Sequence, residues 1–112
     1  MPGMKLGKDL VAASSAPLVL AILQQEGESY GYAIIQRVRD LSRGQMEWTD
    51  GMLYPVLHRL EAQGAITARW RVSPENGRRR KYYAIKTQGK KALEEHRAQW
   101  RIVNGALATV WG

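Results

Sequence analysis

The side chains with the clearest chemical capability in this sequence are cations gathered into one segment. Residues 69–91 hold nine lysines and arginines against one acid, Glu75, which gives the segment a net charge of +8. The other residues hold eight cations against nine acids, so the chain's net charge of +7 originates in this segment. A localised basic stripe fits a polyanion, most often nucleic acid, although a solvated and solubilising face would have the same composition.

Side chains able to do covalent or metal chemistry are scarce. The 112 residues include no cysteine and two histidines, His58 and His96, whose spacing is not that of a metal site. The sequence contains no nucleophile motif, phosphate-binding glycine loop or group of clustered carboxylates. We therefore expect no catalytic residue, no metal and no cofactor, and the sequence argues against an enzyme.

Length and hydropathy predict one domain without a membrane segment. The chain is 45% hydrophobic and long enough to bury a core without disulfides. Its longest strongly apolar run, residues 17–23, is too short to span a bilayer. Lys5 and Lys8 are not followed by the long apolar stretch and cleavage pattern of a signal peptide. We expect a cytoplasmic protein that does not interact with membranes.

Glycines and hydrophobic periodicity divide the first half of the chain into three helices. We expect a first helix over residues 8–26, which Pro17 either kinks or begins. A second helix is expected from about residue 32 to 41, capped by Ser29. A third begins after Thr49, whose hydroxyl can accept an N–H group of the first turn.

The periodicity then changes to that of β-strands. Residues 66–72 and 81–85 are short segments with β-forming side chains on either side of Asn76 and Gly77. An Asn-Gly pair is a strong signal for a tight hairpin turn in which both residues take positive φ. Because an isolated hairpin is marginally stable in water, it must pack on the helices. We expect Trp70 to pin it to the body of the protein.

A long final helix follows, capped by Thr87 and ending near Trp111. Three short helices, a basic hairpin and a long helix are the elements of a winged helix-turn-helix. The expected fold class is therefore mainly α with a two-stranded β wing. We expect a DNA-binding domain over residues 1–86, whose first helix also contributes to a dimer, and a C-terminal dimerisation helix over residues 87–112.

The final helix has a heptad seam, a stripe of side chains spaced alternately three and four residues apart. Two copies could bury these stripes against each other, which predicts a homodimer; packing on the first helix of the same or the partner chain is the alternative. A two-fold dimer would place two recognition helices about 34 Å apart on a palindromic site. The seam consists of Leu93, His96, Trp100, Val103, Leu107 and Val110.

Trp100, in the middle of the seam, has two interpretations. It is either an anchor of the core, which the periodicity alone favours, or the floor of a flat apolar cavity at the dimer axis. A cavity of that kind would stack a planar aromatic ligand.

Candidate DNA-contacting residues surround the second and third helices and the tip of the hairpin. The start of the third helix can offer backbone N–H groups to a phosphate, and the cations of the hairpin would contact phosphates or enter the minor groove. For Tyr30 and Tyr54 the competing interpretation is half-buried packing with the hydroxyl at the surface. The full set is Lys5, Lys8, Tyr30, Tyr32, Thr49, Asp50, Gly51, Tyr54, Pro55, Arg59, Arg78, Arg79, Arg80 and Lys81.

Five groups of residues together resemble the PadR family of bacterial transcriptional regulators. The combined pattern spans most of residues 30–89 and is highly specific, whereas any one fragment would be weak. The resemblance implies a dimeric winged-helix repressor. The matching segments are residues 30–34, 51–61, 64–66 with Trp70, 77–85 and 87–89.

The short chain with one C-terminal helix resembles the smaller branch of that family, which includes a multidrug-sensing repressor. In multidrug-binding members planar compounds stack between paired tryptophans in the dimer pore, and Trp100 matches that tryptophan. Asn104 stands where an acidic residue would favour a cationic compound, so the resemblance implies a neutral or different ligand. The implied ligand-binding residues are Leu10, Ala13, Trp100, Val103, Asn104 and Leu107.

Two functions of different classes follow from these observations. In a ligand-responsive repressor, an effector bound at the dimer interface would change the spacing of the recognition helices and lower affinity for a palindromic operator in double-stranded DNA. An architectural DNA-binding protein would show the same salt dependence, no operator preference and no release by a ligand.

Overall fold

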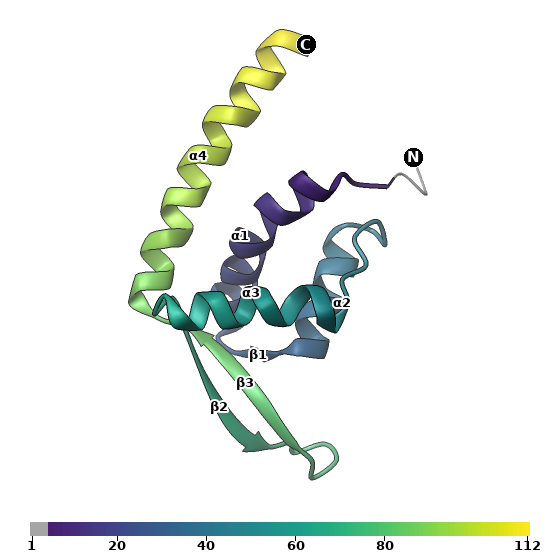
Figure 1. Ribbon diagram of the computed structural model, residues 1–112, viewed down its shortest axis with the longest axis vertical. Helices are drawn as coiled ribbons and strands as arrows, with labels where there is room; N and C mark the ends of the chain where they lie inside the picture. The colour runs from purple at the N-terminus through teal and green to yellow at the C-terminus, as the bar shows by residue number, and fades with distance from the viewer. Residues whose placement is uncertain (1–4) are drawn as a thin grey trace.

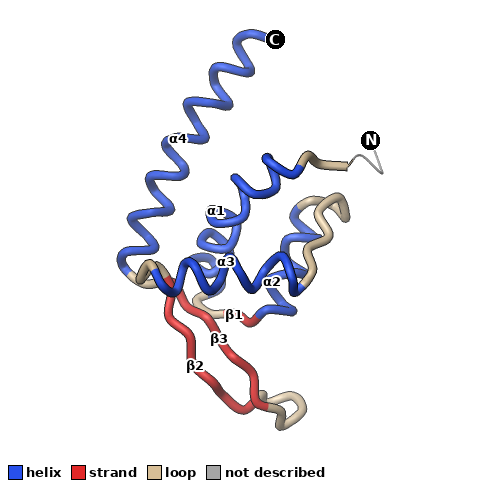
Figure 2. The backbone as a smooth tube through the Cα atoms, viewed as in Figure 1, coloured by secondary structure: helices blue, strands red, loops and turns tan. Residues whose placement is uncertain are grey.

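The computed structural model describes residues 5–112 (Figure 1). In this part of the chain, three helices pack together, a hairpin projects from one end of them, and a long helix extends in the opposite direction (Figures 1 and 2). This arrangement confirms the mainly helical winged helix-turn-helix. The elements are α1 (Lys8–Glu26), β1 (Ser29–Tyr30), α2 (Gly31–Leu41), α3 (Asp50–Ala62), β2 (Ile66–Val72), β3 (Arg79–Ile85) and α4 (Thr87–Trp111).

Helix α1 has the predicted bounds and continues through Pro17, so the proline does not begin the helix. Around the proline, the Ser15 hydroxyl donates a hydrogen bond of 2.6 Å to the carbonyl of Val11. The helix ends at Gly27, whose φ of 85° is costly for residues with a side chain, and whose N–H bonds the Leu23 carbonyl at 2.9 Å. The sequence signal for this helix end is therefore confirmed.

The predicted Ser29 cap is wrong, because Ser29 belongs to a third strand. The backbones of Ser29 and Tyr30 pair with Tyr83 and Tyr82 of β3. Helix α2 consequently begins at Gly31, with Tyr30 in the capping position and no side-chain cap. The hairpin is thus part of an antiparallel sheet with the order β1-β3-β2, which ties it to the start of α2.

The other two predicted caps have different outcomes. Thr49 caps α3 as expected, since its Oγ1 accepts a hydrogen bond of 3.3 Å from the N–H of Met52. Thr87 is the first residue of α4 instead of its cap, and Lys86 holds the capping position without a side-chain bond. Both helices nevertheless begin within one residue of the expected place.

The hairpin loop is longer than the predicted two-residue turn. Strand pairing ends with Val72 opposite Arg79, so residues 73–78 form the connection and β3 begins two residues before the expected position 81. Gly77 has a φ of 71°, but Asn76 is not in the positive-φ region. Its Oδ1 instead accepts a hydrogen bond of 3.0 Å from the Arg78 N–H.

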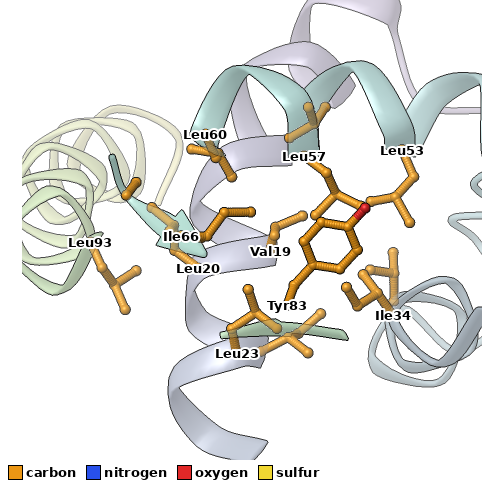
Figure 3. Packing of buried hydrophobic residues seen from close by; sticks show 14 of the residues in the cluster. Val19, Leu20, Leu23, Ile34, Leu53, Leu57, Leu60, Ile66, Tyr83 and Leu93 are labelled. Carbon is orange, nitrogen blue, oxygen red and sulfur yellow. The ribbon is translucent and has the colours of Figure 1, made fainter. Parts of the chain in front are cut away.

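The core lies among α1, α2, α3 and the near end of the hairpin (Figure 3). Tyr83 of β3 enters it from below α3, and the base of α4 closes the side (Figure 3). At that base Gly89 approaches the backbone so closely that an added Cβ would lie 2.1 Å from the Ala65 carbonyl oxygen. The labelled core residues are Val19, Leu20, Leu23, Ile34, Leu53, Leu57, Leu60, Ile66, Tyr83 and Leu93.

Within residues 5–112, no helix combines the length and the apolar character that crossing a bilayer requires.

Candidate nucleic-acid interface

Helix α3 has one buried side and one exposed side. Leu53, Val56, Leu57 and Leu60 recur at helical spacing and pack into the core. The residues that we expect to contact DNA from this helix lie on its solvent-accessible surface, which leaves that surface available to a ligand. They are Thr49, Asp50, Gly51, Tyr54, Pro55 and Arg59.

Tyr54 combines the two interpretations given to it above. Its side chain is 38% exposed, while its hydroxyl lies so near α2 that a Cβ on Gly31 would be 2.9 Å from it. The ring also lies 6.3 Å from that of His58, centroid to centroid. Tyr32 at the start of α2 is 66% exposed. The aromatic surface of the helix pair is thus partly packed and partly open.

The hairpin, which we call the wing, has two faces of different character. Directly paired residues of antiparallel strands point to the same side of a sheet. We define the α3-side face as Ile66, Ala68, Trp70 and Val72 of β2 with Arg79, Lys81, Tyr83 and Ile85 of β3. The rear face consists of Thr67, Arg69 and Arg71 with Arg80, Tyr82 and Ala84.

Aromatic rings on the rear face hold two of its arginines. The Arg71 guanidinium lies 4.2 Å from the Tyr82 ring centroid, and that of Arg80 lies 4.2 Å from the Tyr30 centroid. The two tyrosine rings meet edge to face at 5.5 Å. Side-chain hydrogen bonding to Tyr82 raises the pKa of Arg80 above its ordinary value. In these cation–π contacts each guanidinium lies over the face of a tyrosine ring, which holds the arginine in place.

An acidic residue outside the wing pairs with two rear-face arginines. Glu28, just before β1, forms ion pairs with Arg71 and, at 3.5 Å, with Arg69. The charge count over residues 69–91 did not anticipate these ion pairs and gave Glu28 no role. No local pattern could reveal the pairing, because it depends on β1 joining the sheet beside β3.

The α3-side face changes from buried to open along its length. Tyr83 is 1% exposed, and burial raises the pKa of its hydroxyl to about 12. That hydroxyl has no hydrogen-bond partner within the described residues. Farther out, Trp70 is 58% exposed and the Arg79 guanidinium lies 5.3 Å from its ring centroid. The expectation that Trp70 pins the wing to the body is therefore wrong, because the strands carry it past the edge of the core.

Cations also gather at the start of α1. Lys5 and Lys8 line a groove of about 560 Å³ together with Arg59 of α3. The groove also contains Trp48, which is 5% exposed and was not among the predicted residues. A usable signal was present: Trp48 and Leu53 flank the start of α3 at the spacing of a hydrophobic staple, and both belong to the buried cluster.

A second groove, of about 710 Å³, separates α1 from α4. Its lining is mainly apolar and includes Leu10, Pro17 and Trp100, while Ala13 and Val103 join Trp100 around a smaller adjoining hollow. Four of the six residues suggested for ligand binding thus border these hollows. The other two, Asn104 and Leu107, border neither and lie on the exposed end of α4.

The seam of α4 is buried at its start and exposed beyond it. Leu93 is 3% exposed and belongs to the chain's own core, so it is not available to a partner. Val103, Leu107 and Val110 are 48%, 39% and 86% exposed. Residues 102–111 contain no charged side chain. This part of the helix presents an unusually apolar surface to solvent.

Across residues 5–112, the structure brings no three His, Asp or Glu side chains together as a metal site would require.

Known proteins share both the sequence pattern and the fold. The model of the transcriptional regulator PadR-like family matches residues 19–95. Transcriptional regulator YqjI of Escherichia coli (strain K12) is 34% identical over 86 residues, which cover 77% of this chain and 39% of that protein. The chain therefore spans well under half the length of that relative.

Two solved structures match nearly the whole chain. A transcriptional regulator from Clostridium thermocellum Cth-833 superimposes with a TM-score of 0.81 and 26% identity, covering 92% of this chain and 98% of that one. A PadR family transcription regulator from Clostridium difficile R20291 gives a TM-score of 0.77 and 29% identity, covering 88% and 99%. The expectation of a non-enzymatic protein agrees with these regulators. Because the family model matches well over half of the sequence, the protein belongs to the PadR-like family of transcriptional regulators.

Proposed function

We propose that the protein is a homodimeric repressor that binds a palindromic site in double-stranded DNA and is released by a small apolar or aromatic effector. The observation that best supports DNA binding is the open surface of α3 next to a sheet whose segment, residues 69–91, has a net charge of +8. A helix of this exposure can enter a major groove while neighbouring cations bind phosphates.

The contacts divide into two kinds. The start of α3, at Asp50 and Gly51, would offer backbone N–H groups to a phosphate beside the Thr49 side chain, which already accepts the Met52 N–H. Tyr54 and Pro55 present side chains to the groove, and Arg59 extends the contact toward the N-terminal lysines. Base contacts from α3 would supply specificity, while phosphate contacts supply most of the affinity and its salt dependence.

A second copy of the chain is the partner that the exposed seam of α4 fits. Val103, Leu107 and Val110 lie on one helical stripe, and no charge interrupts residues 102–111. Burying such a stripe against its own copy removes apolar area from water on both chains. The two-fold axis would then relate two copies of α3 for the two halves of a palindrome.

The groove between α1 and α4 supports the effector part of the proposal. Its volume of about 710 Å³ lies in the range of small-molecule pockets, and its lining combines apolar side chains with the indole of Trp100. An effector bound there would shift the DNA-binding equilibrium only if it binds the free dimer more tightly than the DNA-bound dimer.

Footprinting of the DNA upstream of the protein's own gene, with and without planar aromatic compounds, tests the proposal. Protection of a palindromic segment that is lost with a compound supports it. Protection that persists with every compound argues against the effector. Uniform protection of unrelated DNA indicates an architectural DNA-binding protein instead.

A further inference from the structure

We infer that the wing contacts DNA through its α3-side face, with Trp70 as an apolar contact next to Arg79 and Lys81, and that the rear-face arginines do not take part. This inference rests on the proposed DNA-binding function and assigns the surface and residues with which the wing performs it. It differs from the sequence prediction, which included Arg80 among the contacts and gave Trp70 a packing role.

The rear-face cations already form contacts within the chain. Arg71 is paired with Glu28 and stacked on Tyr82, and Arg80 is stacked on Tyr30. A phosphate contact by Arg71 would compete with the Glu28 ion pair, and one by Arg80 would have to be made while its guanidinium lies over the Tyr30 ring. Arg69 shares the same carboxylate at 3.5 Å. Glu28 thus offsets part of the positive charge of the rear face, whose three arginines and one paired acid leave a net charge of +2.

The α3-side face of the wing lies on the same side as helix α3. Tyr83 lies on the α3-side face, and its ring points toward Leu53 and Leu57 on the inner side of α3 (Figure 3). Trp70 and Arg79 lie on the same side of the same strands, beyond the edge of the core. A duplex seated on the outer surface of α3 and reaching the wing would therefore meet this face first.

The α3-side face combines exposed apolar side chains with cations. Trp70 and Val72 are 58% and 64% exposed, although they are large apolar side chains, and they lie directly opposite Lys81 and Arg79 on the neighbouring strand. Neither β2 nor β3 contains an acidic residue. Exposed aromatic and aliphatic groups set among cations fit the sugar and base edges of a groove bounded by phosphates. Charge and shape therefore indicate double-stranded DNA as the partner of this face.

The test compares variants on the two faces by measuring duplex affinity over a range of salt concentrations. Arg79→Ala should weaken binding and reduce the steepness of the salt dependence by about one, because one phosphate contact is lost. Arg69→Ala is the matched control. It also removes one arginine, but from strand β2 and from the rear face of the wing. It should leave both the affinity and the steepness within error of the original protein.

Variants at Trp70 test the apolar contact separately from the ionic contacts. Trp70→Ala should weaken binding about tenfold at every salt concentration, because it removes a large apolar contact, with at most a small change in steepness. Trp70→Phe should recover part of that loss because it retains an aromatic ring. Thermal unfolding of each variant controls for folding, and the exposure of the side chain predicts little change in melting temperature.

The outcomes distinguish this inference from the proposed function. If the original protein binds duplex DNA but Arg69→Ala reduces the salt dependence while Trp70→Ala and Arg79→Ala bind normally, the assignment of the face is overturned and DNA binding stands. If the original protein does not bind duplex DNA, the proposed function itself fails. Loss with Trp70→Ala and Arg79→Ala, but not with Arg69→Ala, supports the inference.

Discussion

The buried hydroxyl of Tyr83 gives a quantitative test of the core and of how the wing joins it. The side chain is 1% exposed, its hydroxyl is unpartnered within the described residues, and burial raises its pKa to about 12. In the unfolded chain the pKa is about 10. A raised pKa in the folded state gives stability that is complete below pH 10 and is lost as the pH rises toward 12.

The size of this effect follows from the two pKa values. At pH 11 ionisation of this hydroxyl lowers the free energy of unfolding by about 1.4 kcal/mol. At still higher pH the decrease approaches about 2.7 kcal/mol. Tyr83→Phe removes this contribution. It also removes a buried hydroxyl without a partner, so at pH 8 the variant should be as stable as the original or up to about 1 kcal/mol more stable.

Urea unfolding at a fixed protein concentration, repeated between pH 8 and pH 11, measures the free energy of unfolding of both proteins. Lysines and the other tyrosines titrate in the same pH range, but both proteins contain them. The difference between the two free energies of unfolding therefore isolates Tyr83. The difference should widen in favour of Tyr83→Phe as the pH rises. Parallel curves over the whole range would refute the account of a hydroxyl kept protonated by burial.

Three further predictions concern the helix cap, the base of α4 and the seam. Thr49→Ala removes the acceptor of the Met52 N–H bond and should lower the free energy of unfolding by about 1 kcal/mol in urea titrations, whereas Thr49→Ser should retain most of it. Gly89→Ala places a Cβ 2.1 Å from the Ala65 carbonyl oxygen and should destabilise by at least about 2 kcal/mol; an unchanged melting temperature would contradict this close approach. Leu107→Glu should shift sedimentation toward a monomer while circular dichroism stays constant, and an unaltered dimer would show that the partner binds elsewhere.

The sequence predicted the helices well because their apolar spacing is local. The end of α1 follows from the glycine at position 27, and α3 begins at the Thr49 cap as expected. Strand β1 was missed because two residues are too few to show a periodicity. Its absence from the prediction explains the wrong cap at Ser29.

The candidate site was predicted less completely because it depends on long-range pairing. The charge count located the wing, but only the register of β2 and β3 separates Trp70 and Arg79 from the arginines of the opposite face. Glu28 is distant from Arg71 in sequence and reaches it only through the sheet. How far the wing extends beyond the core, and hence the exposure of Trp70, is likewise a property of the assembled fold.

The most direct test of the central claim is the binding of the full chain to a labelled palindromic duplex, followed by fluorescence anisotropy at several salt concentrations with random duplex as competitor. The account predicts two chains per palindrome, an affinity that falls linearly with salt on logarithmic axes, and resistance to the random competitor. Absence of binding at low salt, or equal displacement by random duplex, would contradict the account of a sequence-specific regulator.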